Sequence, residues 1–121
     1  MTETTTAKKT TARRVQPKPD LLHLAMTEAR AEARTLADLP KELIGGQHPH
    51  RAAEIYRSRG GDWDLINKRR EAVGTGGVDG LIVQAAFEAF STQEPAKVRE
   101  GLVRLAALAG AAVEDIDKAA A

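Results

Sequence analysis

Residues 78–121 read VDGLIVQAAFEAFSTQEPAKVREGLVRLAALAGAAVEDIDKAAA, and this stretch decides the fold. Its segment LIVQAAFEAF, residues 81–90, is apolar almost all round, which predicts the most buried helix of the molecule. Pro95 suits the first turn of a second helix, because its missing N–H costs nothing there. The apolar residues of that second helix follow a 4-3-4-3-4 spacing, which is typical of an antiparallel bundle or coiled-coil contact. They are Val98, Leu102, Leu105, Ala109, Ala112 and Ile116.

The chain before residue 78 also has helical spacing. Asp20 is placed to cap an amphipathic helix that starts at Leu21, and Pro40 marks its end or a break. The sequence GGQHPH, residues 45–50, predicts a loop. Residues 51–59 and 63–73 predict two further helices, with Gly60-Gly61 ending the first and Asp62 capping the second. We therefore expect an all-α domain of about five helices over residues 20–121, without a sheet.

Composition supports one helical domain. The chain has 121 residues, which is enough for a single core. Aromatic residues make up only 3%, so the core must be built from alanine, leucine, valine and isoleucine, which suit packed helices. The chain has no cysteine, which excludes disulfides, thiolate nucleophiles and cysteine zinc sites. It also lacks an apolar run of the roughly 20 residues that span a bilayer, so we expect a soluble cytoplasmic protein without membrane contact.

The first 19 residues differ from the rest of the chain. They are threonine-rich, almost free of large apolar residues, and end in Pro17-Lys18-Pro19. Such a segment buries too little surface to offset its ordering entropy, which predicts a disordered basic arm. Its charges either bind phosphate or a partner, or simply keep the terminus in solution. The basic residues of this interpretation are Lys8, Lys9, Arg13 and Arg14.

Short motifs from residue 45 onward carry a family resemblance. They are GGQHPH at residues 45–50, Glu88-Ala89, Glu94-Pro95-Ala96-Lys97, Arg99-Glu100-Gly101-Leu102-Val103, and Val113-Glu114-Asp115-Ile116-Asp117 at the end of an alanine-rich helix. On these motifs the chain resembles the MazG-like all-α nucleotide pyrophosphohydrolase superfamily, in particular its small actinobacterial and phage members. About two thirds of the chain, from residue 45 onward, is covered.

The resemblance implies a metal site that is degenerate in this chain. Active members carry a Glu-Glu-x-x-Glu motif and further acidic groups on the next helix, and these carboxylates hold magnesium against a nucleotide triphosphate. The corresponding positions here are Gln84, Ala85 and Glu88, and the acidic position of the next helix falls at Gly101, with Glu100 one residue out of phase. The residual metal candidate is therefore Glu88, with Gln84 and Glu100. We predict no catalytic residue and no cofactor, and Mg²⁺ is expected only if the chain is a hydrolase.

The family resemblance also predicts where Gly101 lies. If the two helices that hold the metal in relatives still pack together, Gly101 contacts the face that carries Gln84 and Glu88. Restoring Glu at positions 84, 85 and 101 together should then destabilise the metal-free protein, because carboxylates would be buried without their ion. Divalent metal should recover part of the loss.

Three functions remain open at this point. The first is a non-catalytic helical domain that forms a homo-oligomer or binds a partner protein; its packing residues are Leu102, Leu105, Ala109, Ala112 and Ile116. The second is a nucleic-acid-binding module that uses the arm and basic helix faces. Its residues are Lys8, Lys9, Arg13, Arg14, Arg57, Arg59, Lys68, Arg69 and Arg70. The third is a divergent nucleotide pyrophosphohydrolase with a site around Glu88, Glu94 and Glu100.

Overall fold

The computed structural model describes residues 18–121, and every regular element in this part of the chain is an α-helix. The helices are α2 (Leu21–Thr35), α3 (Pro49–Ala72), α4 (Val78–Ala89) and α5 (Pro95–Ala120). The all-α prediction is thereby confirmed for residues 18–121. Most of the predicted arm, residues 1–17, lies outside the described residues. No helix of the described part has the length and apolar character needed to cross a bilayer.

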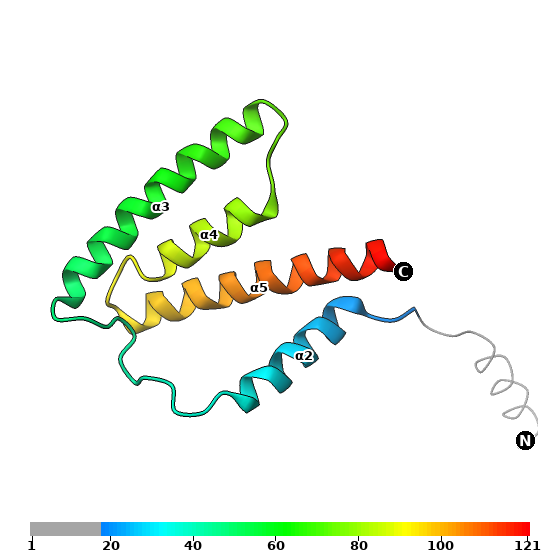
Figure 1. The fold of residues 1–121 in the computed structure, drawn as a ribbon, viewed down its shortest axis with the longest axis horizontal. Helices are drawn as coiled ribbons and strands as arrows, with labels where there is room; N and C mark the ends of the chain where they lie inside the picture. Colours follow the sequence, from blue (N-terminus) through cyan, green and yellow to red (C-terminus); the bar gives the residue numbers. More distant parts are fainter. Residues whose placement is uncertain (1–17) are drawn as a thin grey trace, which may run out of the picture.

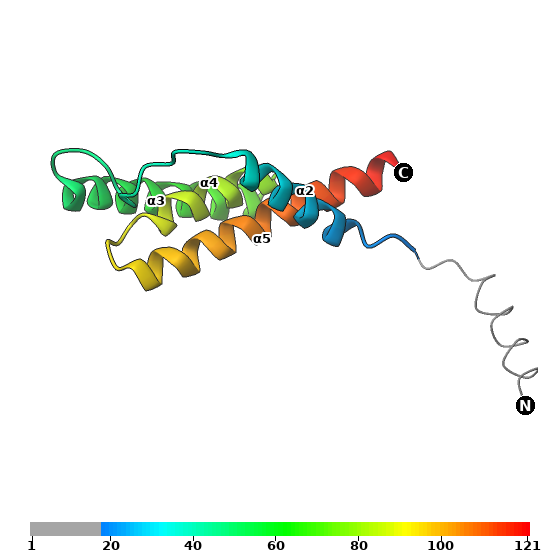
Figure 2. The ribbon, with the colours of Figure 1, turned by 90° about the horizontal axis from the view of Figure 1, so that it is seen from below.

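The helices lie in a single layer. Each helix contacts only the helix or helices beside it in the layer: α3 contacts α4, α4 contacts α5, and α5 contacts α2. Figure 1 shows this order, with α3 and α2 at the two edges. In the view of Figure 2, turned by 90°, the linker from α2 to α3 runs along one side of the layer. Helices are normally packed in two layers around a core, so this chain alone forms an open arrangement.

Local signals fix several helix ends as the sequence predicts. The Asp20 side chain accepts a hydrogen bond from the backbone N–H of His23 at 2.9 Å and caps α2. Pro95 occupies the first turn of α5. Gly74 adopts a φ of 74°, in the left-handed region that favours glycine, directly after the C-cap of α3. The backbone N–H of Thr75 then bonds back to the carbonyl of Arg70 at 2.8 Å, which closes the end of α3.

The prediction of about five helices is wrong for the described residues, because Gly60-Gly61 does not interrupt α3. The predicted helices at residues 51–59 and 63–73 are one helix, and Asp62 lies inside it rather than at a cap. Each glycine costs a helix roughly 0.5–1 kcal/mol, but Gly60 is buried against α4. A Cβ at Gly60 would meet Glu88 Cγ at 3.4 Å, so this glycine permits close packing of α3 on α4. The predicted loop is also shorter, since α3 already begins at Pro49.

The core of this layer is thin. The buried apolar residues are Ala25, Ile44, Ala53, Ala85, Ala89 and Val98, and Val98 is the only large side chain that is fully buried. Helix α4 contributes the highest share, with Gly80, Ala85 and Ala89 buried among its 12 residues, as its apolar sequence predicts. Even so, Leu81 of α4 is 45% exposed. Four of the six buried apolar residues are alanine, so little apolar area is removed from water.

Small residues set the closest helix contacts. A Cβ at Gly101 of α5 would lie 2.6 Å from Ala89 Cα and 2.7 Å from Ala89 Cβ of α4. A Cβ at Gly110 would lie 2.6 Å from Met26 Sδ of α2. Neither position leaves room for a larger residue without movement. Gly101 therefore marks the side of α5 that faces α4, and Gly110 marks the side that faces α2.

Candidate functional site

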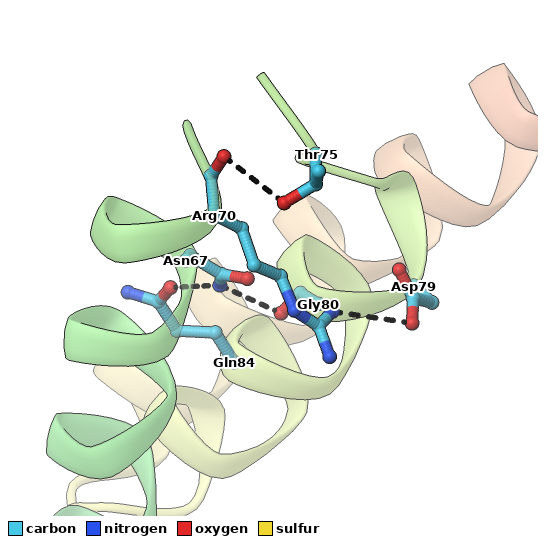
Figure 3. Close-up of polar contacts among 6 residues, drawn as sticks. All are labelled: Asn67, Arg70, Thr75, Asp79, Gly80 and Gln84. Atoms are coloured by element: carbon cyan, nitrogen blue, oxygen red, sulfur yellow. Dashed lines mark hydrogen bonds and ion pairs between the residues drawn. The ribbon is translucent and has the colours of Figure 1, made fainter. Parts of the chain in front are cut away.

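A polar network joins α3 to α4 near the middle of both helices. Asn67 Nδ2 donates to Gly80 O at 3.0 Å and to Gln84 Oε1 at 2.7 Å, as Figure 3 shows. Gln84 Nε2 in turn donates to Asp64 Oδ1 at 3.2 Å and to Glu88 Oε2 at 3.1 Å. The side-chain amides of Asn67 and Gln84 thus each donate two hydrogen bonds, so neither has an unpaired N–H group. Asp64, Asn67, Gln84 and Glu88 form the polar cluster of this molecule.

Lys68 completes the polar cluster on its solvent side. Lys68 Nζ lies 2.9 Å from Asp64 Oδ2, one turn along α3. The hydrogen bond from Lys68 lowers the pKa of the Asp64 carboxyl below its ordinary value, and Gln84 contributes in the same direction. The pKa of Lys68 is raised by the same contact with Asp64. The contact with Lys68 therefore favours the ionised form of Asp64.

A second set of polar contacts closes the α3–α4 turn. Arg70 Nη1 lies 3.5 Å from Asp79 Oδ2, and the Thr75 hydroxyl donates to the Arg70 carbonyl at 3.3 Å (Figure 3). The guanidinium of Arg70 also lies 5.4 Å from the centre of the Trp63 ring, within cation–π distance. Trp63 is half-buried next to this contact. The sole tryptophan thus anchors the end of the helical hairpin.

The metal candidates predicted from the sequence are divided between two helix contacts. Gln84 and Glu88 point toward α3, where they meet Asp64 and Gly60. No hydrogen bond or ion pair within residues 18–121 joins Glu100 to Gln84 or Glu88. The prediction that Gly101 contacts the Gln84–Glu88 face is wrong: Gly101 packs on Ala89, which lies one residue and about 100° further around α4.

A shallow hollow opens beside the polar cluster. It is lined by Arg57, Gly60, Gly61, Asp64, Glu88 and Ser91 and encloses about 410 Å³. Arg57 Nη2 donates to the Ser91 carbonyl at 2.7 Å and closes one end. Residues 18–121 contain no group of three histidine, cysteine, aspartate or glutamate side chains placed to hold a metal ion. Two carboxylates with an amide N–H pointing at both are a poor ligand set for Mg²⁺, which takes oxygen ligands in octahedral geometry.

The sequence analysis missed Asp64 and Asn67 as members of this cluster. The signal was present, since residues 64 and 67 lie one turn apart on α3 and so share a face. Pairing them with residues 84 and 88 of α4 required the register of α3 against α4. That register depends on α3 being continuous through Gly60 and Gly61, which the sequence analysis excluded.

The basic residues of the nucleic-acid interpretation that lie in the described part differ in their contacts. Lys68 and Arg70 are paired with aspartates, and Arg57 donates to a backbone carbonyl. Arg59 and Arg69 are exposed. The remaining candidates, Lys8, Lys9, Arg13 and Arg14, lie outside the described residues.

The predicted packing seam of α5 is only partly buried. Leu102, Leu105 and Ala112 are half-buried, Ala109 is exposed, and Ile116 is 67% exposed. An apolar hollow of about 450 Å³ lies over the first half of α5 and extends to Leu43 of the linker. Its lining is Leu43, Pro95, Val98, Arg99, Leu102, Val103 and Ala106. Much of the seam is therefore open to solvent.

No protein family, curated protein or solved structure matches this chain at a significant level.

Proposed function

We propose that this chain is a non-catalytic helical domain that assembles with a second copy of itself. One observation carries the proposal: the single helical layer leaves its apolar side chains uncovered while its own core is thin. Fourteen large apolar residues of residues 18–121 are exposed, from 37% at Val113 to 73% at Val73, whereas two, Ile44 and Val98, are buried. Scattered exposed leucines are normal in soluble proteins, but a core with two large buried side chains is not.

The need to bury the exposed apolar surface of the helical layer supports a second copy as the partner. Burial stabilises a fold by about 25 cal/mol for each Å² of apolar surface removed from water, and this layer buries mostly alanine. A partner that buries the remaining apolar surface therefore has to be available whenever the chain is present. Another copy of the same chain always meets that condition, and obligate homodimers are stable only together.

The polar cluster supports the non-catalytic part of the proposal. Gln84 holds Asp64 and Glu88 apart with its two N–H groups, and Lys68 neutralises Asp64. Every amide hydrogen in the cluster already has an acceptor within the protein. The cluster therefore acts as a structural clamp that sets the register of α3 on α4.

Self-assembly is tested by measuring mass and stability over a range of protein concentrations. Light scattering after size exclusion should give a multiple of the 13.0 kDa chain mass. Urea unfolding followed by circular dichroism should shift to higher midpoints as protein concentration rises. A monomer at high concentration, with a midpoint independent of concentration, overturns the proposal.

The absence of catalysis has its own test. The full chain is incubated with a panel of nucleotide triphosphates and Mg²⁺ or Mn²⁺, and released phosphate and pyrophosphate are measured. We expect no release above the protein-free rate. Release that is abolished by Glu88→Gln would contradict the non-catalytic proposal and establish a hydrolase, and it would leave the self-assembly result unaffected.

A further inference from the structure

Helix α5 carries an apolar stripe that residues 18–121 cover only in part: Leu102 is half-buried beside a hollow shared with Leu43 of the linker, and Ala109 and Ile116 are exposed. Its α4 side is marked by Gly101 and its α2 side by Gly110, as given above. At about 100° per residue, one of the two remaining sides holds Leu102, Ala106, Ala109, Val113 and Ile116. We call these five residues the α5 stripe. The opposite side carries Glu100 and Arg104 and is polar.

The geometry points to the α5 stripe as the contact with the second copy, with the two α5 helices packed antiparallel. This inference rests on the proposed self-assembly and names its surface. A twofold axis near Ala106 and Ala109 places the smallest residues where the helices cross most closely. Leu102 of one copy then meets Val113 of the other, and the same contact recurs by symmetry.

The charges of α5 favour an antiparallel second copy over a parallel one. Its first half, residues 95–107, carries Lys97, Arg99 and Arg104 against Glu100, for a net charge of +2. Its second half, residues 108–120, carries Glu114, Asp115 and Asp117 against Lys118, for a net charge of −2. Antiparallel pairing sets each positive half against a negative half, whereas parallel pairing opposes like charges.

This charge order is the reverse of the one that a lone helix prefers. The helix dipole favours acidic side chains near the N-terminus and basic side chains near the C-terminus. The first turn of α5 contains Lys97 and no acidic residue, whereas the last turn contains both Asp117 and Lys118. The basic first turn therefore makes α5 slightly less stable by itself, and pairing with the acidic half of a second copy offsets this effect.

One charge pair lies within reach of the α5 stripe. Arg99 and Asp117 are 18 residues apart, which is five helical turns, so both lie on the same flank of α5. In the antiparallel pair the matching flanks face each other, and Arg99 of one copy approaches Asp117 of the other. Within one chain they are about 27 Å apart and cannot meet.

Cysteine pairing tests the surface directly, because the chain has no cysteine of its own. Under mild oxidation, full-length Ala109→Cys should form a disulfide-linked dimer on a non-reducing gel. Ala107→Cys is the matched control, since Ala107 is also exposed but lies on the polar side of α5. Ile116→Cys should not link to itself, because antiparallel pairing separates the two copies of residue 116 by about 25 Å.

Charge exchange tests the orientation. Arg99→Asp and Asp117→Arg should each weaken dimerisation on the order of tenfold, because two attractive pairs become repulsive. The double variant Arg99→Asp with Asp117→Arg should restore it. A control variant on another helix, Leu65→Lys in α3, where the side chain is 50% exposed, should leave the dimer unchanged.

The outcomes separate this inference from the proposed function. A monomeric wild-type chain overturns both. A wild-type dimer in which Ala107→Cys crosslinks and Ala109→Cys does not overturns the α5 stripe and leaves self-assembly in place. Efficient crosslinking of Ile116→Cys overturns the antiparallel orientation. The same conclusion follows if the charge-exchange double variant dimerises no more tightly than the single variants.

Discussion

Replacing Gly101 with alanine measures how closely α4 and α5 pack. The added methyl group would lie 2.6 Å from Ala89 Cα and 2.7 Å from Ala89 Cβ, well inside van der Waals contact. The Cα belongs to the backbone of α4 and cannot rotate away. The two helices must therefore move apart at this contact.

The magnitude follows from two opposing effects. Overpacking costs typically 1–3 kcal/mol, and the backbone contact puts Gly101→Ala near about 3. Alanine in a helix interior returns about 1 kcal/mol relative to glycine. The free energy of unfolding should fall by about 2 kcal/mol. Gly61→Ala is the control: Gly61 is also inside a helix, but a Cβ there meets nothing within 4 Å, so this variant should gain about 0.5–1 kcal/mol.

Urea unfolding of both variants and the wild type, followed by circular dichroism at one protein concentration, decides the question. Equal concentration is needed because self-assembly raises the apparent stability. The midpoints should fall in the order Gly61→Ala, wild type, Gly101→Ala. If Gly101→Ala is as stable as Gly61→Ala, α4 and α5 do not pack at Ala89 and the reasoning fails.

Three further changes test other contacts. Lys68→Gln should raise the pKa of Asp64 toward its ordinary value in an NMR titration; because the pKa is lowered in the folded state, the stabilisation from this pair is present above the unfolded-state pKa and is lost as pH falls through the folded-state pKa. Asp20→Ala should cost about 1 kcal/mol through the lost cap and speed amide exchange in the first turn of α2. Gln84→Glu should lower the melting temperature, because it replaces two donated hydrogen bonds with a carboxylate beside Asp64 and Glu88; an unchanged melting temperature would show that Gln84 does not bridge them.

Local chemistry was the part of the fold that the sequence could predict. Asp20 accepts a hydrogen bond from its own helix, Pro95 lacks an N–H where none is needed, and Gly74 adopts a conformation that other residues rarely take. Each of these depends on a few neighbouring residues. The prediction at Gly60-Gly61 failed because the deciding contact is with Glu88 and Phe87, far along the chain.

The layered arrangement was beyond sequence reasoning for a similar reason. A 4-3-4-3-4 spacing shows that one side of α5 is apolar, but not which neighbour covers it. In the structure, Leu105 and Ala112 are half-buried, while Ala109 and Ile116 remain exposed. Helical periodicity gives the direction of side chains around one axis, and the choice of partner depends on contacts between distant segments.

The candidate site shows how a glutamine can suit a helix contact better than the acid that the family resemblance expects there. At position 84 a side chain faces Asn67 on one side and two carboxylates on the other. Glutamine accepts from Asn67 with its oxygen and donates to Asp64 and Glu88 with its nitrogen. A carboxylate accepts only, so it would satisfy Asn67 and leave Asp64 and Glu88 facing a third negative charge. Gln84 therefore satisfies both sides of the contact between α3 and α4, where a carboxylate would satisfy only one.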